Sequence, residues 1–141
     1  MALAMDIADA VVAELASGSF SQAIAPQRMV LPQFGLEELA DLRVTVVPKA
    51  VEVTGSTRSV CQHDVQIDIG VQQKLATGDD AEIDALMGLV EEIAEFVRAT
   101  RQFGDAVWVK TENVPIYSQE HLGELRQFAS VLTLTLRVMT T

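Results

Sequence analysis

The chain has 141 residues, of which 49% are hydrophobic and 21% charged, so it can bury the core of one ordinary domain and has no compositional reason to be disordered. Its formal net charge is −10 and its ten basic residues are scattered along the chain, which argues against binding to nucleic acid or to an anionic membrane surface. One cysteine, Cys61, excludes a disulfide scaffold and favours a reducing compartment.

The N-terminal segment predicts an amphipathic helix over residues 4–16. Ile7, Val11 and Leu15 share one apolar stripe, and Gly18 is a typical helix stop. The segment has no positively charged start and carries three acidic residues. We therefore expect a helix of the mature protein and no signal peptide, and no apolar run is long enough to span a membrane.

The next segments predict short β structure. Residues 20–32 are β-prone but contain Pro26, which lacks a backbone donor, so an edge strand is expected. Residues 35–42 predict a short helical turn, and residues 43–53 predict a strand. The valines of this strand change phase near Pro48, which indicates a β-bulge.

A long returning strand is predicted over residues 58–74, after a turn at 54–57. Between Asp64 and Gln72 apolar and polar residues alternate, as in a strand with one buried face. At about 3.3 Å per residue this strand reaches roughly 50 Å, close to the full width of such a domain. The distal part of the hairpin is therefore expected to project beyond the core or to pair with another chain.

The clearest helix is predicted over residues 77–100. Asp79 or Asp80 can cap it, and Glu82 completes a pattern like a capping box. Apolar residues recur at helical spacing and the acidic residues face outward. Gly88 costs about 1 kcal/mol relative to alanine in mid-helix, for which a close backbone approach is one candidate reason.

Two strands are predicted near the C-terminus, over residues 106–117 with an end at Pro115 and over residues 128–140, joined by a loop or single turn at 118–125. The short connection makes them antiparallel neighbours. The sequence therefore predicts a single α+β domain over residues 1–141. Its mostly antiparallel sheet contains a long β-hairpin and is packed on one face by the central helix and the N-terminal helix.

Possible catalytic and metal-binding groups are few. Cys61 and His63 share a face of the predicted strand, but zinc needs three or four protein ligands and His121 lies in a predicted loop. We interpret the pair as a half-buried cysteine and histidine at the start of a strand. The acidic residues between Asp79 and Glu95 do not have the spacing of a calcium loop and are interpreted as a solvated helix face.

Motifs for nucleophilic catalysis and glycine-rich phosphate loops are absent from the sequence. Trp108 and Tyr117 are candidate anchors at an interface, with ordinary strand packing as the alternative. We therefore predict no enzyme activity, no cofactor and no metal.

Several segments occur in a characteristic order: an N-terminal helix, RMVLP leading into LRVTVVPKAVEV, STRSVCQHDVQIDIGVQQK, the helix DDAEIDALMGLVEEIAEFV, the strand VKTENVPIY and the closing strand SVLTLTLRVM. This order resembles that of the phage tail terminator and tail-completion proteins, over roughly residues 4–140.

The resemblance implies a structural virion protein without a cofactor, assembled in the host cytoplasm. Copies of the chain would form a ring, six in related systems, at the head-proximal end of a tail tube. The ring would stop tube polymerisation and provide the surface for head–neck joining. The implied partners are further copies of the chain, the tail tube protein and a neck or head-completion protein, with no membrane.

Two further expectations concern particular residues. DNA would pass through an acidic lumen without specific binding, for which Glu91, Glu92 and Glu95 are the candidate lining residues. The candidate interface residues are Arg43, Lys49, Arg58, Lys74, Trp108 and Tyr117.

Other functions remain open at this point. The same order of elements suits a neck or head-completion protein, or a subunit of a contractile injection particle derived from a phage tail. A small-ligand-binding or enzymatic α+β domain would have a pocket around His63, Trp108 or Tyr117. An assembly chaperone would bind a partner reversibly and be absent from the finished particle.

Overall fold

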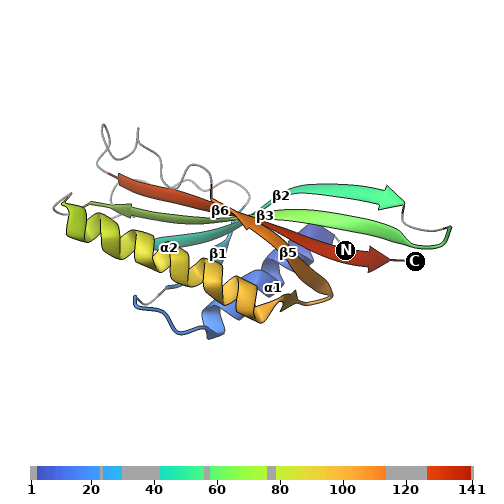
Figure 1. Ribbon diagram of the computed structural model, residues 1–141, viewed down its shortest axis with the longest axis horizontal. Helices are drawn as coiled ribbons and strands as arrows, with labels where there is room; N and C mark the ends of the chain where they lie inside the picture. Colours follow the sequence, from blue (N-terminus) through green and yellow to red (C-terminus); the bar gives the residue numbers. More distant parts are fainter. Residues whose placement is uncertain are drawn as a thin grey trace.

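The predicted α+β class is confirmed by the computed structural model (Figure 1). It describes residues 3–22, 24–29, 42–55, 58–75, 79–113 and 127–140. In chain order the elements of these residues are α1 (Leu3–Ser17), β1 (Gln27–Arg28), β2 (Arg43–Gly55), β3 (Cys61–Lys74), α2 (Asp80–Thr100), β4 (Gln102–Phe103), β5 (Ala106–Glu112) and β6 (Gln127–Thr140).

The strands form a single sheet in the order β1-β2-β3-β6-β5-β4. The two-residue strand β1 runs parallel to β2, and the other neighbours pair antiparallel. The last two long strands are antiparallel neighbours, as predicted. The C-terminal strand β6 lies in the middle of the sheet against β3, a position that the sequence does not predict.

The long hairpin of β2 and β3 is confirmed. Its pairing runs from Arg43 opposite Gln72 to Gly55 opposite Cys61. The register shifts between Pro48 and Ala50, which confirms the predicted bulge at the point where the valines change phase.

The two faces of the sheet differ in chemistry. The apolar residues of β3 lie opposite those of β6, with Val65 facing Leu136 and Ile67 facing Leu134, and all four are 0% exposed. Residues of α1 and α2 pack into the same core, so both helices cover this face, which we call the helix face (Figure 1). We call the opposite side the polar face. On β3 and β6 it carries Gln62, Asp64, Gln66, Asp68, Thr133, Thr135 and Arg137.

The helix α2 begins as the sequence predicts. The carboxylate of Asp79 caps it by accepting a hydrogen bond of 2.9 Å from the backbone N–H of Glu82. A close backbone approach, one candidate reason for Gly88, is not found: among the described residues, no atom beyond the helix's own backbone lies within 4 Å of a Cβ placed there.

Some predicted elements differ from the structure. Of the described residues within the strand expected over 20–32, which are 20–22 and 24–29, Gln27 and Arg28 alone pair in the sheet, and they form an edge strand as expected. The sequence did not predict β4. The helical turn at 35–42, the loop at 118–125 and the strand end at Pro115 lie outside the described residues, apart from Leu42.

Candidate functional site: the distal arm and the polar face

The free end of the hairpin forms a distal arm, which we define as Lys49–Gly55 of β2, Cys61–Asp64 of β3 and Arg137–Thr140 of β6. In Figure 1 the end of β2 and the start of β3 reach to the right, past both helices. Every residue from Lys49 to Gly55 is exposed, so this half of β2 contributes little to the core. The prediction that the hairpin projects beyond the core is confirmed.

The helix face of the arm exposes apolar side chains. Val51 lies opposite the buried Val65, and Val53 lies opposite His63. Yet Val51 is 44% exposed and Val53 is 58% exposed. The apolar stripe of the core therefore continues into solvent along the outermost part of β2.

On the polar face, the strand register arranges side chains in rows across four strands. One row is Val47, Asp68, Thr133 and Glu112, the next is Ala50, Gln66, Thr135 and Lys110, and the most distal of the three is Glu52, Asp64, Arg137 and Val107. Acidic and basic groups from different strands thus lie side by side. This arrangement suits contact with another polar surface.

In the most distal row, the two middle strands contribute an ion pair, formed by Asp64 on β3 and Arg137 on β6. The Arg137 guanidinium donates two hydrogen bonds to the Asp64 carboxylate, of 2.9 Å from Nε and 3.2 Å from Nη2. These bonds hold the pKa of Asp64 below its ordinary value and raise the pKa of Arg137.

A second polar cluster surrounds Asp68. The Thr133 hydroxyl donates a hydrogen bond of 2.8 Å to its carboxylate, and the Lys49 ammonium lies 4.0 Å from it. The bulge lets Lys49 reach the polar face from its position between Pro48 and Ala50. The arm is thereby tied to the centre of the sheet.

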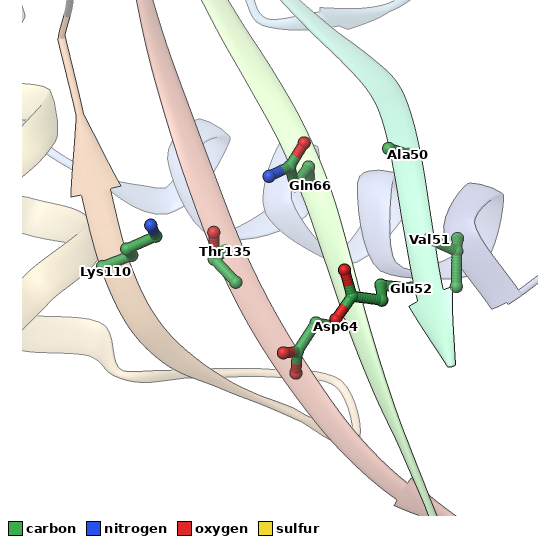
Figure 2. Close-up of a pocket in the computed structure, with 7 residues that line it drawn as sticks. All are labelled: Ala50, Val51, Glu52, Asp64, Gln66, Lys110 and Thr135. Carbon is green, nitrogen blue, oxygen red and sulfur yellow. The ribbon is translucent and has the colours of Figure 1, made fainter. Parts of the chain in front are cut away.

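A shallow hollow of about 430 Å³ opens on the polar face. Figure 2 shows its lining residues, which are Ala50, Val51, Glu52, Asp64, Gln66, Lys110 and Thr135. The Thr135 hydroxyl is buried and has no hydrogen-bond partner within the described part of the chain. The lining offers carboxylates, an amide and an ammonium group, which suit the binding of polar side chains.

Cys61 and His63 differ in their exposure to solvent. Cys61 is exposed, so the expectation of a half-buried cysteine is wrong, whereas His63 is partly buried. Cys61 lies at the far end of the hairpin, opposite Gly55, whereas His63 lies opposite Val138, which is only 5% exposed. Among the described residues, no group of three or more histidine, cysteine, aspartate or glutamate side chains is placed to hold a metal ion.

The basic interface candidates lie in two places. Lys49 is in the distal arm, and Arg58 is exposed in the connection between β2 and β3. Arg43 and Lys74 lie near the other end of the hairpin, opposite Gln72 and Gln127 respectively. The structure therefore does not bring these four residues into a single patch.

The aromatic candidate Trp108 lies on β5 and packs against the core from the helix face. Its indole N–H donates a hydrogen bond of 2.8 Å to Thr111 Oγ1. A register shift between Trp108 and Lys110 places residues three apart on the same face. Trp108 is thus partly buried in ordinary strand packing, and its role as an interface anchor stays a prediction. Tyr117 lies outside the described residues.

Sequence reasoning missed the rows that include Glu52, Lys110 and Arg137. Its only signal was the alternation within single strands. That alternation assigns each side chain to a face but does not reveal which strands are neighbours.

No protein-family model matches the chain, and no curated protein matches its sequence. None of the described helices is long and apolar enough to cross a membrane.

Proposed function

We propose that the protein is a structural virion subunit of the phage tail terminator type, which forms a ring at the head-proximal end of a tail tube. The ring ends tube growth and presents a surface to a neck or head-completion protein. The observation that carries this proposal is the distal arm, a long extension of the sheet with exposed valines that no other described residues cover.

The physical argument starts from the arm's exposure. An exposed strand edge with apolar side chains is a template for pairing with another chain, and proteins normally shorten, cover or charge such an edge. Here the edge extends from Lys49 to Gly55 and includes two exposed valines, Val51 and Val53. A contact with another subunit would bury these side chains and remove the edge from solvent.

The acidic side chains of helix α2 are compatible with a surface that DNA passes without binding. Not all of them are free to serve only that purpose, because some make local contacts. Glu92 accepts hydrogen bonds from the backbone and the hydroxyl of Ser21, and Glu95 pairs with Arg98. Reversing these charges would disturb local contacts as well as the surface potential. Asp84 and Glu91 are exposed and seven residues apart on the helix, so they are the cleaner pair for charge reversal.

The first test is to image the purified protein by negative stain and measure its mass by light scattering, alone and with tail tubes. A closed ring, or density at one end of the tube, is the expected result. A monomer or dimer that ignores tubes would contradict the proposal.

Two matched substitutions sharpen this test. Val51 and Val131 are 44% and 43% exposed, but Val131 lies on β6 away from the arm. We expect Val51→Lys to prevent ring formation and Val131→Lys to leave it intact. Equal effects of the two variants would show that the arm is not the assembly surface.

A further inference from the structure

We propose that neighbouring copies join edge to edge, with the outer edge of β2 in one copy adding antiparallel to the outer edge of β5 in the next. In this joint Glu52 of one copy lies opposite Lys110 of the other. The inference rests on the proposed ring and identifies the two surfaces that close it.

The outer edge of β2 is covered only at its beginning. The strand β1 pairs with Thr45 and Val46, and the last of these contacts is a hydrogen bond of 3.0 Å from Met29 N–H to the Val46 carbonyl. No other strand of the described chain pairs with this edge, and the side chains from Lys49 to Gly55 are exposed. Within the described part of the chain, about seven residues of this edge therefore have no strand partner.

The outer edge of β5 is open at the opposite end. The strand β4 pairs only with Ala106 and Val107, followed by a backbone hydrogen bond of 2.6 Å from Trp108 N–H to the Arg101 carbonyl. No described strand pairs with this edge beyond that point, where the side chains of Lys110 and Glu112 are exposed. Each outer strand thus has one short companion and one open stretch.

The strand directions make these edges compatible. Since β2, β3, β6 and β5 are antiparallel in succession, β2 and β5 run in opposite directions. A copy rotated about a ring axis inclined to the strands therefore presents β5 antiparallel to the first copy's β2, and the inclination accommodates the two-residue stagger between the row of Glu52 and the row of Lys110. The two sheets then keep their polar faces on the same side.

The side chains select the register. Glu52 lies opposite Asp64 and Lys110 lies opposite Thr135, so both point to the polar face. Placing Glu52 opposite Lys110 also places Val51 opposite Thr111, and both of these belong to the helix face. In this register opposite charges meet, and the paired side chains lie on the same face of the joined sheet.

The ends of the joint fit as well. With the bulge at Val109 carried into the joint, Thr54 near the end of β2 falls opposite Val107, where β4 begins to occupy the neighbour's edge, and both of these residues belong to the polar face. Within one copy Lys110 is 3.0 Å from Glu112, so in the joint its ammonium would lie between two carboxylates from different copies. The contact uses different surfaces on the two copies, which is what a closed ring of more than two subunits requires.

Charge reversal provides the test. Glu52→Lys gives a chain with lysine at both edges, and Lys110→Glu gives a chain with glutamate at both edges. Each variant alone places like charges at every joint, and we expect its self-association to be about tenfold weaker or more by analytical ultracentrifugation. An equal mixture can alternate the two chains around an even-numbered ring, so that every joint has opposite charges.

We therefore expect the mixture to form rings with equal numbers of the two chains in native mass spectrometry. The double variant Glu52→Lys/Lys110→Glu should assemble alone. Single variants that assemble as well as the wild type, or a mixture that fails to assemble, would overturn the edge contact while leaving the ring proposal standing. A wild-type chain that stays monomeric alone and with tubes would overturn both.

A covalent test separates this joint from a symmetric pair of β2 strands. In a Cys61→Ser background, Glu52→Cys/Lys110→Cys should form ladders of cross-linked chains under mild oxidation, since directly opposite residues bring their Cβ atoms within disulfide reach. Glu52→Cys alone should give no dimer. Efficient dimerisation of that single variant would instead show that two β2 edges meet.

Discussion

Val51 and Val65 are direct neighbours across the hairpin, yet one is 44% exposed and the other is 0% exposed. They illustrate the difference between the two halves of the sheet. In the half covered by α1 and α2, alternation in the strands produces a buried core. Along β2 in the distal arm the same alternation continues without a covering layer. The strand pattern therefore determines which face a side chain occupies, whereas the helices determine whether that face is buried.

The largest expected effect on stability concerns this pair of valines, one in the core half of the sheet and one in the arm. Val65→Ala removes two buried methyl groups and should lower the free energy of unfolding by about 2 kcal/mol. Val51→Ala removes the same groups from an exposed site and should change it by less than about 0.5 kcal/mol. Urea denaturation of both variants measures the difference. Equal losses would mean that the arm is part of the folded core.

Two glycines, Gly70 in the sheet and Gly88 in helix α2, should respond in opposite ways to replacement by alanine. A Cβ on Gly70 would lie 2.8 Å from Thr45 Oγ1, and Thr45 is 1% exposed and stiff at χ1. Gly70→Ala should therefore cost about 1–2 kcal/mol of stability. Gly88→Ala, in open space on α2, should raise stability by about 0.5–1 kcal/mol.

The control for the first of these is Thr45→Ala, which removes the hydroxyl. In that background Gly70→Ala should cost little, because the atom that it meets is gone. If the cost of Gly70→Ala is the same in both backgrounds, crowding against Thr45 is not its cause.

Much of the fold could be predicted from periodicity and turn chemistry. The hairpin, the bulge after Pro48 and the cap at Asp79 each depend on residues close in sequence, and all three are confirmed. The position of β6 beside β3 could not be predicted, because it depends on contacts more than fifty residues apart. The two-residue strands β1 and β4 are too short to leave a periodic pattern.

The candidate site was less predictable for the same reason. Alternation along each strand assigns Asp64 and Arg137 to polar sides, but their pairing follows from the register of β3 with β6. The basic and aromatic interface candidates are predictions from residue type. Residue type does not reveal that Trp108 packs against the core. Exposure in the arm depends on where the helices end, which no strand pattern contains.

A smaller effect concerns the helix that covers the core half. Asp79→Ala removes the carboxylate that accepts from Glu82 N–H and should destabilise the protein by about 1 kcal/mol. Asp79→Asn keeps an acceptor oxygen at the cap and should restore most of this loss. Thermal unfolding of the two variants tests the cap, and a full loss with asparagine would show that the negative charge near the helix dipole matters more than the hydrogen bond.

The smallest expected effect lies where the core half meets the arm, at the ion pair of Asp64 and Arg137. Hydrogen bonds from Arg137 hold the pKa of Asp64 below its ordinary value of 3.8, so the folded protein binds this proton less readily than the unfolded chain. The stabilisation is therefore present above the ordinary pKa and is lost as the pH falls through the lowered one. It should be small, because the side chains are 21% and 40% exposed and water screens the pair. We expect Asp64→Asn to lower the urea midpoint slightly at pH 7 and by less at pH 2.5. In an Arg137→Gln background this pH-dependent difference should shrink, and a difference that persists there would assign it to groups other than Arg137.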